Sequence, residues 1–377
     1  MRKRNYYIAI VIAAAVAVAI FAVREKRRQP AEPGTSEDRD LAGSGQAAFD
    51  MPVVETGTSR KTEDSAFQAA ASGVSASGGG QVQADGLKDG VILEAAWGAA
   101  PGQLGRSPAR ESNPEDPMSF AAMRNGGICI LDQVNDRVQC FGPHGRLDRQ
   151  FKLERPTAQD ISIGADGKIG MLDRLGEPSL VIHSESGEKI SEIPLVGGPI
   201  TEGGTLTALL RDGEGNYYVE REHQDVIRIA DSGGAADSQR PIFPGRPTRD
   251  GKLFVSASIK SARDGTIILK AFDRMKQLKW EKLLGTRSSV MQILMLESDK
   301  NGNIYVGALV GKLENPEESV IQAVRLNGEN GEISGTIFLP SPKDPHERFR
   351  DLVVAEDGTL LHFESQEKGA EIRRYSF

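Results

Sequence analysis

The chain has 377 residues, of which 26% are charged, 38% hydrophobic and 6% aromatic, a composition typical of a soluble globular protein over most of its length. Its 46 basic and 53 acidic residues give a net charge of −7, which argues against a general nucleic-acid-binding protein. Two cysteines are too few for a disulfide-dense scaffold or for a zinc site built from four thiolates. The 42 glycines and 19 prolines favour a turn-rich β protein over a helical bundle.

Residues 1–28 have the pattern of a transmembrane signal-anchor. An uncharged run from Tyr6 to Val23 lies between basic clusters at residues 2–4 and 24–28. As a helix, the run would cover about 27 Å, close to the thickness of a hydrocarbon core. A cleaved signal peptide is the alternative, but the run is long for one and lacks an adjacent small-x-small cleavage site. We therefore predict that residues 6–23 cross the cytoplasmic (inner) membrane of a bacterium once. The flanking charges are too evenly matched to orient the span.

Residues 29–86 are predicted to form a disordered linker. They are rich in Ala, Gly and Ser, include the stretch SGVSASGGG at residues 72–80, and show no apolar periodicity. The ten basic and ten acidic residues before position 87 cancel. The whole net charge therefore belongs to residues 87–377, which we predict to form one folded domain.

A turn signal recurs six times in that domain. Asp or Asn with Gly precedes a short β-branched or aromatic strand, and the turn glycines follow one another at intervals of about 36 to 56 residues: Gly126, Gly167, Gly215, Gly251, Gly302 and Gly358. Such a period is typical of propeller blades, and the pattern lacks the amphipathic helices of an α/β sheet. We predict an all-β fold, a six-bladed β-propeller preceded by one transmembrane helix and a disordered linker.

Strand order predicts how the ring closes. The first interval supplies an inner strand at Met118–Arg124 and three more strands, whereas the last interval supplies three before the chain ends. Gly90–Trp97 is a strand without a partner in its own interval. Placed outside Glu371–Phe377, it would complete the last blade and join the two ends of the domain. The inner strand of the fourth blade, around Gly245–Arg249, is the weakest.

Residues 91–153 resemble an NHL-repeat propeller unit. The resemblance rests on Trp97-Gly98-x-x-Pro101-Gly102-Gln103-Leu104-Gly105 and on Ile130-Leu131-Asp132-x-x-Asn135-x-Arg137-Val138-Gln139-x-Phe141. It implies a six-bladed propeller that is often a binding platform and occasionally an enzyme. We interpret Asp132, Asn135 and Arg137 as turn-shaping residues. A grip on a ligand is the alternative.

The two cysteines fall opposite each other in the predicted first blade. If Asp132 pairs with Arg137 across the turn, Cys129 faces Cys140 on the neighbouring strand. Two buried free thiols are the alternative to a disulfide. A disulfide would require an oxidising compartment and would place the propeller outside the cytoplasmic membrane.

Candidate site residues fall into two groups. Four long connections are predicted at one face of the ring: Gly98–Pro117, Val196–Gly204, Val310–Glu318 and Pro340–Glu347. They predict a ligand surface that includes Arg106, Arg110, Glu111, Lys343, Asp344 and His346. Inner-strand acidic residues are the alternative site, where a divalent cation such as calcium could bind at the channel mouth: Asp160, Glu297 and Asp351. We find no nucleophile or phosphate-loop motif, so we assign neither catalytic residues nor a cofactor.

These observations favour a membrane-anchored, non-enzymatic platform that binds a protein, peptide or glycan at the cell envelope. A metal-dependent hydrolase or lactonase on the same fold is the alternative. A purely architectural envelope protein is a third class, and nucleic acid is not an expected partner.

Overall fold

The computed structural model describes residues 90–107, 114–341 and 348–377. Among these residues it contains no helix long and apolar enough to cross a membrane. The predicted span at residues 6–23 and the predicted linker at 29–86 lie outside them. The compact unit that contains the described residues runs from Gly78 to Phe377.

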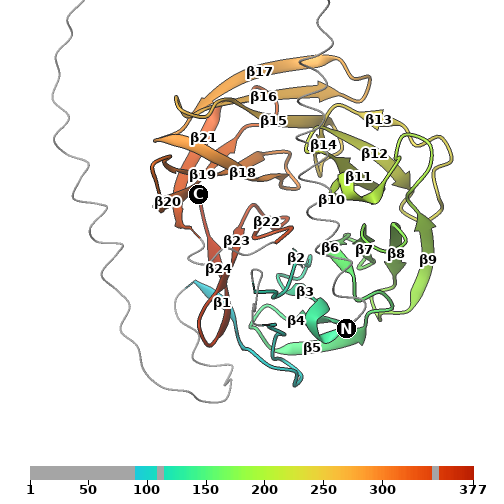
Figure 1. Ribbon diagram of the computed structural model, residues 1–377. Helices are drawn as coiled ribbons and strands as arrows, with labels where there is room; N and C mark the ends of the chain where they lie inside the picture. Colours follow the sequence, from blue (N-terminus) through green and yellow to red (C-terminus); the bar gives the residue numbers. More distant parts are fainter. Residues whose placement is uncertain (1–89, 108–113, 342–347) are drawn as a thin grey trace, which may run out of the picture. The chain divides into compact units, whose positions relative to one another are not determined.

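The described residues form six four-stranded antiparallel sheets arranged as the blades of a β-propeller (Figure 1). The strands of each blade are given from the innermost outward. Blade 1 consists of β2 (Ser119–Ala122), β3 (Ile128–Asp132), β4 (Arg137–Phe141) and β5 (Leu147–Lys152), and blade 2 consists of β6 (Ala158–Ile163), β7 (Ile169–Asp173), β8 (Ser179–His183) and β9 (Lys189–Pro194). Blade 3 consists of β10 (Leu206–Arg211), β11 (Tyr217–Arg221), β12 (Asp225–Ala230) and β13 (Ile242–Phe243). Blade 4 consists of β14 (Arg246–Pro247), β15 (Leu253–Ser261), β16 (Thr266–Asp273) and β17 (Leu278–Gly285), and blade 5 consists of β18 (Ser289–Ser298), β19 (Ile304–Lys312), β20 (Asn315–Leu326) and β21 (Ile333–Pro340). Blade 6 consists of β22 (Leu352–Val354), β23 (Leu360–Ser365), β24 (Gly369–Tyr375) and β1 (Val91–Ala96). Two short 3₁₀ helices lie at Gln133–Asn135 and Gly203–Thr205.

The ring closes as the strand count predicts. β1 pairs with β24 from Val91 opposite Arg373 to Ala96 opposite Gly369. The first strand of the domain is therefore the outer strand of its last blade, which confirms the predicted closure. The structure thus shows an all-β six-bladed propeller.

The turn glycines explain why the repeat is visible in the sequence. All six have positive φ, between +69° and +88°, a conformation that costs glycine little and other residues more. Each lies in the tight connection between an inner strand and the second strand of its blade, two residues before the second strand begins. The local chemistry of these turns therefore sets the period of the fold.

The core consists of apolar layers between neighbouring blades rather than one central mass. Each of six buried clusters joins strands of two adjacent blades. The cluster between blades 4 and 5 has fourteen buried residues, and the one between blades 3 and 4 has five. At that smaller interface the Phe243 and Phe254 rings stack with centroids 4.2 Å apart. Both β13 and β14, which adjoin it, are only two residues long, in line with the weak fourth inner strand expected from the sequence.

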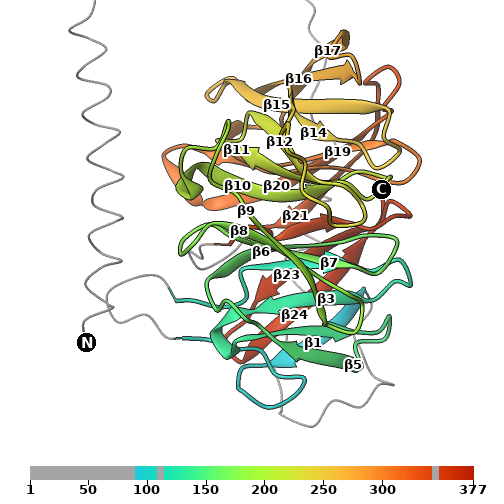
Figure 2. The same ribbon diagram turned by 90° about the vertical axis from the view of Figure 1, so that its right-hand side faces the viewer.

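Blades 4 and 5 are taller than the others. β15 to β21 have eight to twelve residues each, and Figure 2 shows β15, β16 and β17 as long strands at one end of the view. The sequence predicted a long connection at Val310–Glu318, and this prediction was wrong. Lys312 pairs with Asn315, so β19 and β20 continue to a tight hairpin. The added strand length extends the blade instead of forming a loop.

Candidate functional site

The polar residues that carry the family resemblance hold a loop of the chain itself. The amide of Asn135 donates to the Gly98 carbonyl at 2.9 Å. The Arg137 guanidinium donates to the Gln103 carbonyl at 2.8 Å and to the Asp132 carboxylate at 2.8 Å. Both partners of Arg137 thus belong to the two segments that carry the family resemblance. These residues fix residues 98–103 against blade 1, and their hydrogen bonds are used within the chain rather than by a ligand.

The channel centre contains a buried ion-pair network built around Arg350. Its guanidinium donates to Asp160 Oδ2 at 2.8 Å and to the Leu209 carbonyl at 2.9 Å. It also donates to Glu297 Oε1 at 3.1 Å. Burial opposes the positive charge, but the two carboxylates raise the pKa of Arg350 above its usual value. One side chain of blade 6 therefore binds blades 2, 3 and 5 together.

Asp160 and Glu297 belong to the alternative divalent-cation site considered from the sequence, and in the structure both carboxylates bind the Arg350 guanidinium. Both oxygens of Asp160 accept two hydrogen bonds each: Oδ1 from Ser119 and the Ile161 N–H, Oδ2 from the Leu209 N–H and Arg350. The guanidinium occupies the space between the two carboxylates, where a cation would have to bind. Within the described ranges, no three His, Cys, Asp or Glu residues are grouped to hold a metal ion.

A second ion-pair network lies outside the pocket, around Arg348. Asp351, the third predicted metal ligand, accepts a 3.0 Å hydrogen bond from Arg348. Arg348 also donates to both oxygens of Asp116, at 3.0 and 2.8 Å. The Arg174 guanidinium of the β7–β8 turn lies over the Phe349 ring, 4.6 Å from its centroid. Residues 348–351, which precede the inner strand of blade 6, therefore contact both blade 1 and blade 2.

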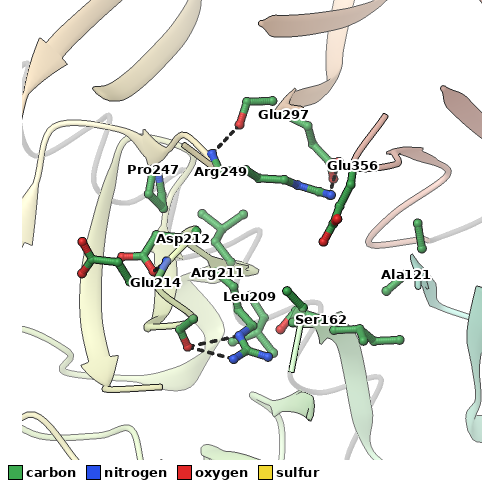
Figure 3. Close-up of a pocket in the computed structure, with 18 of the residues that line it drawn as sticks. Ala121, Ser162, Leu209, Arg211, Asp212, Glu214, Pro247, Arg249, Glu297 and Glu356 are labelled. Atoms are coloured by element: carbon green, nitrogen blue, oxygen red, sulfur yellow. Dashed lines mark hydrogen bonds and ion pairs between the residues drawn. The ribbon is translucent and has the colours of Figure 1, made fainter. Parts of the chain in front are cut away.

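At one end the channel opens into a pocket of about 660 Å³. Its walls come from all six blades, at the ends of the inner strands and the turns that follow (Figure 3). Each blade contributes the residue directly before its Asp or Asn turn: Arg124, Ala165, Arg211, Arg249, Ser298 and Glu356. Sequence analysis did not single out this position, although the repeat itself could have identified it. The last residue before every turn faces the channel mouth.

The pocket lining has an excess of positive charge. It includes seven Lys or Arg residues and five Asp or Glu residues, in a chain whose net charge is −7. Arg211 and Asp166 pair with each other at 3.1 Å, and Arg246 forms a two-bond pair with Glu220 at 2.7 and 2.9 Å. Of these paired groups, Asp166, Arg211 and Arg246 line the pocket.

Three cations at the mouth are less tightly engaged. Arg249 donates to the Val354 carbonyl at 2.7 Å and lies 3.5 Å from Glu297, and Figure 3 shows it on the same wall as Glu297. Arg124 lies 3.8 Å from Glu356, and its side chain is 72% exposed. Lys300 is also exposed. These three side chains can reach a ligand without breaking a buried ion pair.

Acidic residues of the turns next to the mouth are used locally. Asp212 accepts hydrogen bonds from the Asn216 amide at 2.8 Å and the Tyr218 hydroxyl at 2.9 Å. Asp299 binds Asn303 and Tyr305 in the same way in blade 5, at 2.8 and 2.9 Å. This repeated hydrogen-bond pattern closes the turn and aligns the second strand. These carboxylates are therefore structural rather than free for a ligand.

The ligand-face residues predicted from the long connections are only partly described. Arg106 packs its guanidinium over the Trp97 ring, 5.3 Å from its centroid, and faces the Gln366 carbonyl at 3.5 Å. Arg110, Glu111, Lys343, Asp344 and His346 lie outside the described residues. Where the structure is described, it thus places Arg106 against the closing blade, and the pocket opens at the opposite face of the ring.

Cys129 and Cys140 occupy the register that the sequence predicts. Asp132 pairs with Arg137, and Cys129 lies directly opposite Cys140 on β3 and β4. The structure joins the two sulfur atoms in a disulfide. Both residues are fully buried in the apolar layer between blades 1 and 2.

Comparison with known proteins shows likeness in fold at very low sequence identity. No protein-family model matches the chain, and no curated protein sequence matches it. Among solved structures it is similar to hydrazine synthase of Kuenenia stuttgartiensis, at 8% identity and a TM-score of 0.45, over 72% of this chain and 99% of that one. It is also similar to a streptogramin B lyase, at 11% identity and a TM-score of 0.40 over 69% and 93% of the two chains. A third similar structure is U3-55K, at 9% identity and a TM-score of 0.44 over 72% and 98%. The strand pairing above, not these likenesses, defines the propeller, and the NHL resemblance stays a prediction.

Proposed function

We propose that the propeller is a non-enzymatic binding module whose pocket takes an acidic segment of a protein or peptide partner. The observation that carries this proposal is the described lining of the pocket, in which seven basic residues outnumber five acidic ones. Positive charge gathered in a hollow of an acidic protein attracts anions and excludes cations. The volume of about 660 Å³ lies within the usual range for ligand pockets.

Carboxylate side chains suit the cationic groups at the mouth. A guanidinium presents a planar fork of donors that matches a carboxylate, and an ammonium adds a point charge beside it. Arg249 and Lys300 supply one of each. An acidic glycan is less suited, because the described lining contains no aromatic ring against which the apolar face of a sugar could pack.

We also propose that residues 6–23 anchor the protein in the cytoplasmic membrane and that the propeller lies outside it, at the cell envelope. The uncharged run between two basic clusters supports the anchor. The disulfide between the chain's two cysteines supports the orientation, since disulfides persist in oxidising compartments. A binding module on a tether would meet partners near the membrane surface.

The binding proposal is tested with a rhodamine-labelled hexaglutamate peptide and fluorescence anisotropy on the full chain in detergent. We expect saturable binding that weakens as salt is added, and a loss of affinity of about tenfold or more in the double variant Arg249→Gln, Lys300→Gln. Lys279→Gln is the matched control, because Lys279 is exposed on β17 away from the pocket. Equal binding by the double variant and the wild type would contradict the proposal, as would equal binding of a neutral hexaglutamine peptide.

The orientation is tested on protein isolated from native membranes. Thiols are blocked before lysis, and the peptides that contain Cys129 and Cys140 are analysed by mass spectrometry without reduction. We expect them to be linked by the disulfide. Two blocked thiols would remove this support for a propeller outside the membrane.

A further inference from the structure

The pocket has an apolar level inside its charged mouth. Each inner strand runs toward its Asp or Asn turn, so residues the same number of places before each turn lie at a similar depth. Directly before the turns lie the residues of the mouth, among them Arg124, Arg211 and Arg249. Two places further in, five blades line the pocket with an apolar residue, and blade 6 adds a valine. We call these residues the apolar collar: Ala122, Ile163, Leu209, Pro247, Leu296 and Val353.

The collar is aliphatic and comes from every blade. Ala122, Ile163 and Pro247 are half-buried, so part of their apolar surface is open to solvent. Leu209 and Leu296 are buried and support the walls from behind. Figure 3 shows Leu209 and Pro247, which come from adjacent blades. An apolar group that covers this surface removes it from water, and that burial is favourable.

The interior of the pocket is a poor place for a carboxylate. Arg350 lines it, but this guanidinium already donates to Asp160 at 2.8 Å and to Glu297 at 3.1 Å. A ligand carboxylate at this depth would compete with two carboxylates of the chain for one cation, as a like charge beside them. Arg124 and Lys300 at the mouth are exposed instead. The mouth therefore suits charge, and the collar suits an apolar group.

From this layering we propose that the acidic segment bound at the mouth inserts one aliphatic side chain, about the size of leucine, into the apolar collar. This proposal rests on the proposed function and adds a feature of the partner, which is an apolar residue with acidic residues on both sides. The carboxylates stay with the cations of the mouth. A volume of about 660 Å³ has room for both kinds of group.

Two rhodamine-labelled heptapeptides test the collar through fluorescence anisotropy on the full chain in detergent. Each has three glutamates on either side of a central residue, which is leucine in one peptide and serine in the other, so their charges are equal. We expect the leucine peptide to bind about tenfold tighter or more, because its side chain is withdrawn from water. Equal affinities would overturn this inference and leave the proposed function standing. If neither peptide binds, both fail.

Matched alanine substitutions locate the effect. Ala122→Leu fills the collar from its own wall, whereas Ala165→Leu makes the same change at the mouth, directly before the turn of blade 2. Filling the collar should bring the affinity ratio of the two peptides close to one, and the change at the mouth should keep the preference for leucine. The opposite result in the two variants would overturn the proposal.

A third variant keeps the test decisive if Ala122→Leu does not fold. Ile163→Ala trims the collar instead of filling it, so it should lower the affinity ratio by about threefold. Urea denaturation of each variant shows whether it is folded. A folded Ile163→Ala variant with the wild-type ratio would overturn the proposal.

A small amphiphilic anion is the rival occupant, since hexanoate also joins a carboxylate to an aliphatic chain. The leucine peptide adds carboxylates on both sides of its apolar group, so it can use several cations of the mouth at once. We expect hexanoate to displace the labelled leucine peptide only at concentrations about a hundredfold or more above those of the unlabelled peptide. Displacement at equal concentrations would assign the pocket to a small amphiphile and overturn the proposal.

Discussion

The two ends of the channel contain similar residue types in different states. At one end Arg348 is matched to the Asp116 and Asp351 carboxylates at 2.8 and 3.0 Å and is almost enclosed. At the other end Arg124 and Lys300 are exposed, and Arg249 has its nearest carboxylate at 3.5 Å. Burial with full pairing turns a charge into a structural link. Partial pairing at a mouth leaves a charge available for a ligand, so position rather than residue type separates the two roles.

Removing the closing strand β1 should disrupt the whole ring, and with it both ends of the channel. Deletion of Val91–Ala96 exposes the edge of β24 and opens the apolar layer between blades 6 and 1. We expect loss of the cooperative unfolding transition, followed through circular dichroism during a urea titration. A variant that unfolds cooperatively at the wild-type midpoint would contradict the role of β1 in closing the ring.

Breaking the buried ion-pair network around Arg350 should cost several kilocalories per mole. Arg350→Met leaves the buried carboxylates of Asp160 and Glu297 without their shared cation. We expect the free energy of unfolding to fall by about 3–5 kcal/mol, measured by urea denaturation.

Arg124→Met is the control at the open end. Its side chain is exposed and distant from its carboxylate, so we expect a change below about 0.5 kcal/mol. Similar losses in the two variants would remove the distinction between the two ends.

Acid should lower the stability of the folded protein through Glu220. Burial opposes ionisation of this carboxyl, but the Arg246 guanidinium outweighs the effect and holds the pKa of Glu220 well below its ordinary value of 4.5. The unfolded chain therefore takes up a proton near pH 4.5 while the folded chain does not, so stability falls as the pH drops below that value. The loss from this group can approach roughly 1.4 kcal/mol for each pH unit.

The comparison variant is Glu220→Gln, measured by urea denaturation between pH 3 and 7. Its stability should depend less steeply on pH below 4.5 than that of the wild type, while the difference between the two proteins stays constant above about pH 5.5. Parallel curves over the whole range would show that Glu220 does not have the depressed pKa.

A moderate effect should come from the turns around the open mouth. Tyr305→Phe removes the 2.9 Å hydrogen bond to Asp299, and Tyr218→Phe removes its counterpart to Asp212. We expect each to lower the free energy of unfolding by about 0.5–1.5 kcal/mol. Because the two turns share one geometry, unequal losses of more than about 1 kcal/mol would show that they are not equivalent.

The sequence by itself determined the features that depend on local chemistry. The Asp-Gly and Asn-Gly turns fixed the six-fold repeat, because a glycine with positive φ is needed at each one. The strand count fixed the closure by β1, and the register from Asp132 to Arg137 placed Cys129 opposite Cys140. These inferences need only neighbours in the sequence and the pairing rules of a sheet.

Only the tertiary structure decided which charges are linked and which stay available. The sequence marked Asp160 and Glu297 as acidic inner positions but gave no sign that Arg350, 190 residues from Asp160, would bind both. The distance between such groups depends on ring closure and on how residues 348–351 enter the channel. The positions before the turns were visible in the repeat, but their grouping at one mouth became evident only once six separate strands shared an axis. Electrostatic roles arise from distances between blades, and those distances are a property of the assembled ring.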